Sequence, residues 1–409
     1  MSGERHVLTN GLTVAVDPLP GAQSFALGLY ASVGSRSEPE RLSGLAHLVE
    51  HMVFKGAGGR DTRALAEVIE DVGGSLNAWT ARDQTVFHGR ALARDISLVT
   101  ELIADLVRAP HLEEEHLERE KQVILSELGE SVDSPDDLVH DHLFEGAFGG
   151  QAIGRPVLGR EETVCSATAK DCSDWITQQF VPCRLVLSAS GKVEPEVILA
   201  LAERLFGDME SREAPVIEPA EFTGGARNDA RRFEQAHWCL GFRGLPADHP
   251  ASPALALFVQ ALGGGTSSRL FQELREERGL AYSIYAWSQA FSDTGLVGIG
   301  CAAERREAVR SVELARQMLI ETAGGLRKDE LSRARAQMEA GLLMGLETPQ
   351  GRADQMARSI EVFGRILSLD ELLDQIRSVN VEDCQAAGQM LLEGPVAVGS
   401  VGVKLAIAA

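Results

Sequence analysis

The sequence predicts an α+β protein built from two homologous domains, each a mostly antiparallel sheet with helices packed on one face. Three observations support this prediction. Short segments alternate apolar and polar residues as strands do, other segments have the 3.6-residue periodicity of helices, and the second half of the chain repeats the order of the first. Because strands and helices come in runs and not in strict strand–helix–strand units, the mixed α+β class is favoured.

The first strands and helices follow from local patterns. Residues 6–16 alternate around Asn10-Gly11, the dipeptide of a tight turn, so they predict a hairpin, and residues 25–34 predict the next strand. Residues 43–55 have helical periodicity, with Ser43 as the expected N-cap. Residues 62–72 predict a second helix, which Gly73-Gly74 ends.

Two strands and two helices are expected next. Residues 75–91 read as two strands joined by a polar turn at 81–83, and residues 92–107 as a helix that starts near Asp95. A long helix is predicted over 113–130, after Pro110. Its apolar side is expected to comprise Leu117, Val123, Ile124 and Leu128.

The second half repeats this order. The strand at 25–34 matches residues 237–244, the segment 89–95 matches 300–306, and the segment that begins at Leu112 aligns without gaps on the one that begins at Leu326. Chance similarity between amphipathic segments is the alternative, but three ordered matches favour duplication. A segment rich in Pro, Gly and charge separates the halves, so we expect domains at 1–212 and 229–409 with a linker at 213–228.

Composition excludes several classes of protein. The 409 residues have a formal net charge of −21, which repels nucleic acid and anionic lipid. This charge indicates either a preference for basic peptides or simply solubility. The six cysteines form no CxxC pair, no segment is apolar over a membrane-spanning length, and the first residues lack a signal-peptide pattern. We therefore expect reduced thiols and a cytoplasmic protein without a membrane partner, unless a leader has been removed.

The chemistry centres on His47-Leu-Val-Glu-His51. Histidines four residues apart project from one face of a helix, where they can bind one ion. Neutral imidazole is a good zinc ligand, and Glu50 lies on the same side, where it can accept a proton from an attacking water. The order HxxEH is the inverted form of a known zinc-peptidase pattern. A solvated helix face with His and Glu is the alternative reading.

A third ligand is predicted on the helix at 113–130. Glu120 and Glu127 lie two turns apart on one face, so both can approach one site. Glu127 interrupts an apolar run, and a carboxylate buried there would need a cation, which zinc supplies. Glu120 is then an outer carboxylate, because a fourth protein ligand would close the open position, or an ordinary surface residue.

The repeat provides an internal control. Gly341 stands at the position of Glu127, and Ala334 at the position of Glu120. Residues 254–262 are apolar or neutral where the first half has the motif. The scaffold therefore does not require the His/Glu set.

These motifs resemble the inverted-motif zinc metallopeptidases that include pitrilysin, insulin-degrading enzyme and mitochondrial processing peptidase. The resemblance rests on HLVEH at 47–51 with Glu127, and extends to LNAWT at 76–80, RDQTVF at 82–87, and long segments at 141–159 and 263–284. It implies that His47, His51 and Glu127 hold one Zn²⁺ per chain. It further implies that Glu50 is the general base and Glu120 a supporting catalytic carboxylate.

The resemblance adds residues that the patterns alone do not identify. It implies that Arg275 and Tyr282 hold the substrate backbone and polarise the scissile carbonyl, whereas by pattern alone Arg275 is a surface residue. It also implies that a peptide adds as an extra strand along Asn77, Ala78, Trp79 and Thr80, with core packing as the alternative for Trp79. The glycine run at 263–265 reads as a flexible turn, not a phosphate site.

Long members of the family carry four such units in one chain and this chain has two, so the resemblance implies a second chain. We expect a homodimer that encloses a chamber and hydrolyses short or unfolded peptides as a zinc endopeptidase. The alternatives are one subunit of a heterodimeric processing peptidase and a non-catalytic scaffold subunit, although the latter would be expected to have lost ligands.

Overall fold

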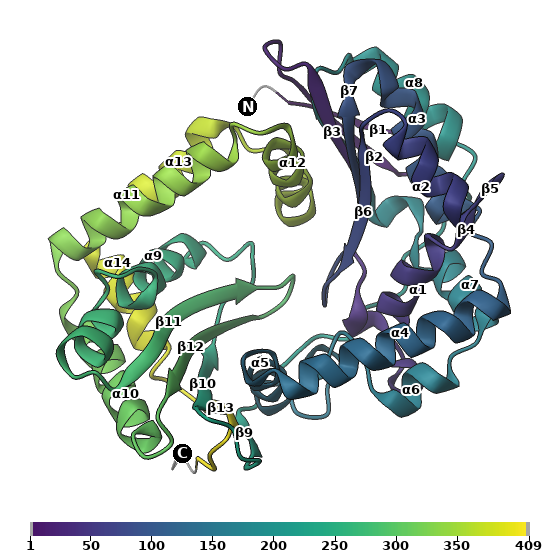
Figure 1. Ribbon diagram of the computed structural model, residues 1–409. Helices are drawn as coiled ribbons and strands as arrows, with labels where there is room; N and C mark the ends of the chain where they lie inside the picture. The colour runs from purple at the N-terminus through teal and green to yellow at the C-terminus, as the bar shows by residue number, and fades with distance from the viewer. Residues whose placement is uncertain (1–2, 406–409) are drawn as a thin grey trace. The chain divides into compact units, whose positions relative to one another are not determined.

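The computed structural model describes residues 3–405, which form two compact units that alternate along the chain (Figure 1). Unit 1 comprises the chain up to Leu128, Pro156–Glu218 and Leu343–Leu369. Unit 2 comprises Gly129–Arg155, Pro219–Leu342 and the chain from Asp370 onward. The α+β class is confirmed.

Unit 1 contains a six-stranded sheet in the order β1-β2-β8-β3-β7-β6. All neighbouring strands are antiparallel except β2 and β8, which are parallel. The expected hairpin at 6–16 and the strands at 25–34 and 75–91 are all present. The strands are β1 (Glu4–Val7), β2 (Thr13–Pro18), β3 (Ser24–Ala31), β6 (Ser75–Thr80), β7 (Thr85–Leu92) and β8 (Leu185–Gly191).

One face of this sheet buries its alternate residues, such as Val14, Leu27 and Leu29, against a helical layer. A short hairpin of β4 (Gly56–Ala57) and β5 (Arg60–Asp61) follows the first helix. The helices of this part of the chain are α1 (Leu45–Val53), α2 (Thr62–Glu70), α3 (Ile96–Arg108), α4 (Glu114–Asp133), α6 (Glu161–Ser166), α7 (Ala169–Gln179) and α8 (Pro195–Phe206).

Unit 2 repeats this topology, which supports the duplication. Its sheet has the order β11-β12-β10-β13-β9, with the single parallel pair again between β13 and β9. The strands are β9 (Gly225–Asp229), β10 (Ala236–Arg243), β11 (Ala281–Ala290), β12 (Gly295–Ala303) and β13 (Ala397–Val401). The helices are α9 (Ser252–Gly263), α10 (Ala308–Gly325), α11 (Lys328–Gly345), α13 (Leu369–Arg377) and α14 (Val381–Met390), with a π-helix at Phe271–Glu277.

Each sheet also carries a helix on its other face, which the sequence did not predict (Figure 1). In unit 1 this helix is α12 (Pro349–Phe363), whose Met356 and Ile360 pack with Tyr30 and Val186. In unit 2 it is α5 (Pro135–Ala147), which packs on β10 and β13.

The two helices occupy equivalent places in the repeat, because Pro135 and Pro349 are as far apart as Leu112 and Leu326. Each half of the sequence thus provides one helix to the unit built mainly by the other half. The compact units are therefore interleaved, whereas the predicted domains, 1–212 and 229–409, follow the order of the chain.

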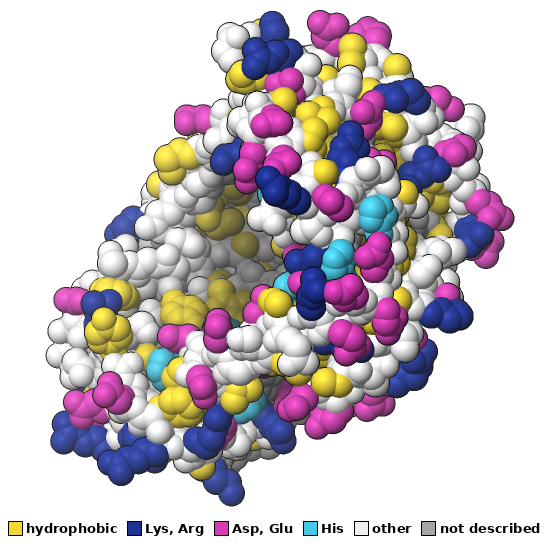
Figure 2. Space-filling model, turned by 45° about the vertical axis from the view of Figure 1, so that its right-hand side comes forward, with side chains coloured by type: hydrophobic (Ala, Val, Ile, Leu, Met, Phe, Trp, Pro, Cys, Tyr) yellow, Lys and Arg dark blue, Asp and Glu magenta, His cyan; other side chains and the backbone are white. Residues whose placement is uncertain are grey.

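Charged side chains of both signs are interspersed on the face shown in Figure 2. No helix among residues 3–405 combines the length and the apolar character that crossing a bilayer requires.

Candidate metal centre

Helix α1 presents the motif histidines, and a buried glutamate fixes its start. Glu38 accepts the backbone N–H groups of Gly44 (2.8 Å) and Ala46 (2.7 Å). Gly44 is the N-cap residue with φ +94°, and a Cβ atom there would lie 2.7 Å from the carbonyl oxygen of Leu158. The expected cap by Ser43 is therefore wrong, because the carboxylate of Glu38 satisfies the first N–H groups instead.

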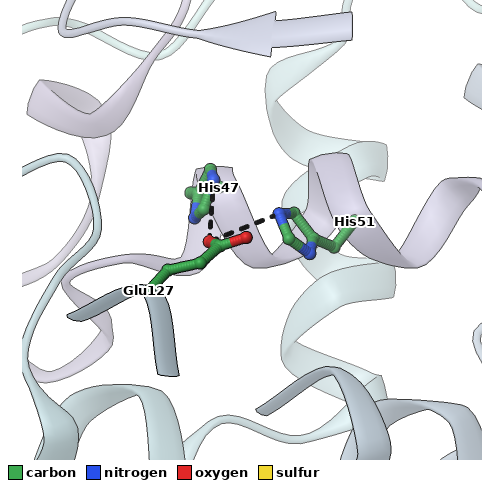
Figure 3. Close-up of side chains that lie close together, drawn as sticks. All are labelled: His47, His51 and Glu127. Atoms are coloured by element: carbon green, nitrogen blue, oxygen red, sulfur yellow. Dashed lines mark ion pairs between the residues drawn. The ribbon is translucent and has the colours of Figure 1, made fainter. Parts of the chain in front are cut away.

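His47, His51 and Glu127 converge as predicted (Figure 3). Glu127 reaches from α4 so that its carboxylate lies between the two imidazole rings of α1. Its Oε2 lies 4.0 Å from His47 Nε2 and 3.8 Å from His51 Nε2. One ligand atom from each residue lies within 4.8 Å of the other two.

These distances fit a shared ion better than direct hydrogen bonds. A nitrogen–oxygen separation of 3.8 Å or more is too long for a hydrogen bond. Ligands about 2.0–2.1 Å from a tetrahedral zinc lie roughly 3.4 Å from one another, close to the spacing seen here. Burial, with a smaller contribution from His51, lowers the pKa of His47 to about 4, so this ring is neutral at pH 7 and can bind a metal. Two histidines and a carboxylate form a suitable donor set for zinc.

Glu120 supports the site from behind His51. The protonated Nδ1 of His51 donates to Glu120 Oε2 at 3.2 Å, which leaves Nε2 free on the side of Glu127. Glu120 is therefore an outer partner of His51, and its side chain is only 9% exposed. This burial is inconsistent with the alternative of an ordinary surface glutamate.

The burial argument for Glu127 is wrong, although its position is as expected. Its side chain is 38% exposed, and Val123, one turn earlier, is also exposed, so this part of α4 is not an apolar run facing the core. Only Leu117, Glu120, Lys121 and Ile124 of α4 are buried. A half-buried third ligand leaves part of its carboxylate in contact with water.

Glu50 lies among the same groups. Burial raises the pKa of this carboxyl, and Glu127 adds to that effect while the Thr80 hydroxyl and His51 oppose it. Its Oε2 is buried and accepts no hydrogen bond from residues 3–405; the Thr80 hydroxyl is near enough to favour the charged carboxylate, but it is itself without a hydrogen-bond partner in this part of the chain. An unpartnered carboxylate oxygen beside the candidate ligands is free to accept a proton from a bound water.

The segment expected to pair with a peptide forms strand β6, the last strand of the unit 1 sheet, and it contacts α1. Within residues 3–405, β6 pairs only with β7, so the backbone groups along its other edge pair with no strand. Ala78 is buried, Asn77 is exposed and Thr80 is half-buried. Trp79 is 41% exposed, so simple core packing does not account for it.

Arg275 and Tyr282 belong to unit 2. Arg275 lies on the π-helix at Phe271–Glu277, a form of helix often found at functional sites, and its guanidinium lies 4.7 Å from the centre of the Phe271 ring. Tyr282 is the second residue of strand β11 (Ala281–Ala290) and is 72% exposed. The structure thus places this pair and the zinc set in different units.

The inverted motif together with a glutamate on a second helix defines the zinc-peptidase type of site. Residues 13–161 match the family Insulinase (Peptidase family M16), and residues 166–338 match the Peptidase M16 inactive domain. The chain is 33% identical to an uncharacterised zinc protease of Streptomyces coelicolor, covering 95% of this chain and 87% of the relative. It is 30% identical to the uncharacterised zinc protease YmxG of Bacillus subtilis, covering 95% of both chains. This chain belongs to peptidase family M16.

Solved structures support the fold. A protease from Helicobacter pylori superposes with a TM-score of 0.90 at 21% identity, covering 98% of this chain and 99% of that chain. The peptidase M16 inactive domain from Pseudomonas fluorescens gives the same TM-score and identity, covering 100% of this chain and 99% of that chain.

Proposed function

We propose that this protein is a zinc-dependent endopeptidase that hydrolyses short or unfolded peptides. The observation that carries the proposal is the convergence of His47, His51 and Glu127 beside the unpartnered carboxylate oxygen of Glu50. The names of the relatives, zinc proteases, agree with it.

Each residue has a defined role in this proposal. His47, His51 and Glu127 would hold one zinc ion per chain, which when bound polarises the scissile carbonyl and acidifies water. Glu50 accepts the proton of the attacking water and passes it to the leaving amine. Strand β6 pairs with the substrate backbone, which explains tolerance of many sequences.

Arg275 and Tyr282 complete the proposed site as donors to the substrate carbonyl. Family members with four units build their chamber from one chain, so we propose that this two-unit chain forms a homodimer around a chamber. Sedimentation of the purified chain tests this assembly, and a heterodimeric processing peptidase is the alternative if the chain stays monomeric.

The central experiment measures metal content and hydrolysis of an internally quenched peptide. We expect about one zinc per chain, activity that is lost on chelation and regained with zinc, and activity lowered by about 10²- to 10⁴-fold in Glu50→Gln despite full zinc content. A protein that binds zinc yet cleaves none of a varied peptide library would support the scaffold alternative, and one that binds no zinc would contradict the proposal.

A further inference from the structure

Lys55 follows α1 and makes a contact that neither the motif nor the repeat suggests. Its Nζ lies 2.9 Å from Glu120 Oε1, while the other carboxylate oxygen, Oε2, accepts from His51. The two oxygens of one carboxylate are therefore held by two different partners. We propose that Lys55 is a positioning residue that fixes Glu120 and, through it, the ring of His51; this inference rests on the proposed zinc site.

The surroundings of Glu120 show why it needs a cation. Its side chain is 9% exposed, and Leu117 and Ile124, one turn away on either side, are fully buried. A carboxylate in such a place is stable only when its charge is paired and its oxygens are hydrogen-bonded.

Lys55 supplies this pairing among residues 3–405. Lys121 follows Glu120 on α4, but its ammonium group pairs with Glu118 at 2.6 Å. Among the described residues, Lys55 is thus the lysine that pairs with Glu120.

The consequence for the metal centre is geometric. With Oε1 held by Lys55, Oε2 stays directed at His51 Nδ1, so Nε2 points to the side where Glu127 lies. Without Lys55, the Glu120 side chain loses one of its two restraints. It can then rotate away from His51 or approach the metal as an extra ligand, which would close the position that water needs.

Two other roles for Lys55 make different predictions. A lysine after the last turn of α1 also stabilises the negative end of the helix dipole, and that role affects only stability. A direct charge effect has the opposite sign from positioning, because removing a cation near the site should tighten the binding of Zn²⁺. Positioning predicts weaker zinc binding.

The test compares Lys55→Met with Lys55→Arg, which keeps the cation, and Lys55→Gln, which keeps only a donor. Lys170→Met is the matched control, because Lys170 also forms an ion pair, with Asp174 on the surface of α7. Zinc affinity is measured by titrating metal-free protein against a competing chromophoric chelator, with circular dichroism to confirm folding. Hydrolysis of a quenched peptide gives kcat and KM.

We expect Lys55→Met to weaken zinc binding, by no more than the about 10- to 100-fold that losing Glu120, the outer partner of His51, would cause, and to lower kcat more than it raises KM. Lys55→Arg should be near wild type, Lys55→Gln intermediate and Lys170→Met unchanged. In a Glu120→Ala background, Lys55→Met should have no further effect, because both changes interrupt the same contact.

Unchanged or tighter zinc binding in folded Lys55→Met overturns the inference, and so does additivity with Glu120→Ala. If Lys55→Met does not fold, the same comparison between Lys55→Gln and Lys55→Arg decides. Absence of zinc binding by the wild type would instead refute the proposed function itself.

Discussion

Glu50 and Glu120 are two carboxylates near the same histidines with different surroundings. Glu120 has both oxygens occupied, by His51 and Lys55, whereas one buried oxygen of Glu50 has no partner within residues 3–405. A fully paired carboxylate orients its neighbours, and an unpaired one can take up a proton. These differences support the roles proposed above, in which Glu120 positions His51 and Glu50 transfers the proton.

Glu50→Gln tests this assignment, because it preserves the shape of the side chain and removes its basicity. We expect kcat to fall by about 10²- to 10⁴-fold while zinc affinity stays near the wild-type value. Stopped peptide assays and the chelator titration measure the two quantities. Glu70→Gln, at the exposed end of α2, is the control; equal activity of Glu50→Gln and this control would rule out Glu50 as the base.

The sequence predicted which residues of the site come together, since helical spacing determines the face on which His47, His51 and Glu127 lie. It did not predict their depth. The apolar run around Glu127 predicted a buried side chain, and Glu120 was allowed as an ordinary surface residue. In the structure the Glu127 side chain is 38% exposed and that of Glu120 is 9% exposed. The depth of a side chain depends on which distant residues pack against it, as His51 and Lys55 do against Glu120, and no local pattern encodes those contacts.

At the scale of elements, α1 is held in place by contacts that lie outside it. Glu38 precedes the helix by several residues, and its carboxylate caps the first N–H groups across a turn. The usual preference for Ser, Thr, Asp or Asn at the N-cap position therefore predicted Ser43 and missed this contact. The acidic residue near the N-terminus of the helix was visible in the sequence. Gly44, which donates one of these N–H groups, has a left-handed backbone that glycine adopts most readily.

Glu38→Ala should destabilise the protein by ~2 kcal/mol or more, because two buried N–H groups at the start of α1 lose their acceptor. Since α1 carries both histidines, zinc affinity should fall as well. Thermal unfolding and the chelator titration check both effects, with the exposed Glu40→Ala as control. A Glu38→Ala protein with the control's melting temperature would show that the cap contributes little.

Helix α12 is fixed to the unit 1 sheet by polar as well as apolar contacts. Tyr30 donates its hydroxyl to Asp354 at 2.5 Å, Ser32 donates to Glu361 at 3.0 Å, and Arg352 pairs with Asp17 at 2.7 Å. Burial, reinforced by Asp354, raises the pKa of Tyr30 well above its usual value. Folding therefore favours the protonated phenol.

This pKa shift predicts a pH-dependent contribution to stability. Because the pKa of Tyr30 is higher in the folded state, this residue contributes its full stabilisation below the unfolded-state pKa of about 10. The stabilisation then decreases as the pH rises above that value. Tyr30→Phe should lower the free energy of unfolding by ~1–3 kcal/mol at pH 8, and this difference from wild type should shrink at pH 10.5.

Urea unfolding at both pH values measures the stability difference between Tyr30→Phe and wild type, with hydrogen exchange along α12 as a local probe. Tyr282→Phe is the control for the loss of an exposed hydroxyl. A stability difference for Tyr30→Phe that is the same at both pH values would contradict the assignment.

At the scale of the whole molecule, the repeat predicted two sheets of equal topology but not which helix covers which sheet. Both α5 and α12 are amphipathic segments that follow equivalent long helices, and either could have packed within its own half. The choice depends on contacts distant in sequence, such as Ser188 donating to the carbonyl of Ala353. Local patterns carry no information about such pairings, so the domain prediction followed the order of the chain.

The proposed site draws on residues that belong to different units, which leads to a test of the proposed dimer. The zinc set belongs to unit 1 and Arg275 and Tyr282 to unit 2. If each site of a homodimer combines the two sets from different chains, Glu50→Gln and Tyr282→Phe inactivate different parts of it. Mixing the two inactive variants should then produce one site with both wild-type halves in each mixed dimer.

With random exchange, half of the dimers are mixed and each has one intact site of two, so about one quarter of wild-type activity should return. The measurement is the peptidase rate after subunit exchange, with each variant alone as the baseline. A mixture of Glu50→Gln with Glu50→Gln/Tyr282→Phe is the matched control, because it contains no intact base. If the first mixture stays at the baseline although labelled chains demonstrably exchange, Tyr282 does not act across the dimer, and both sets must work within one chain.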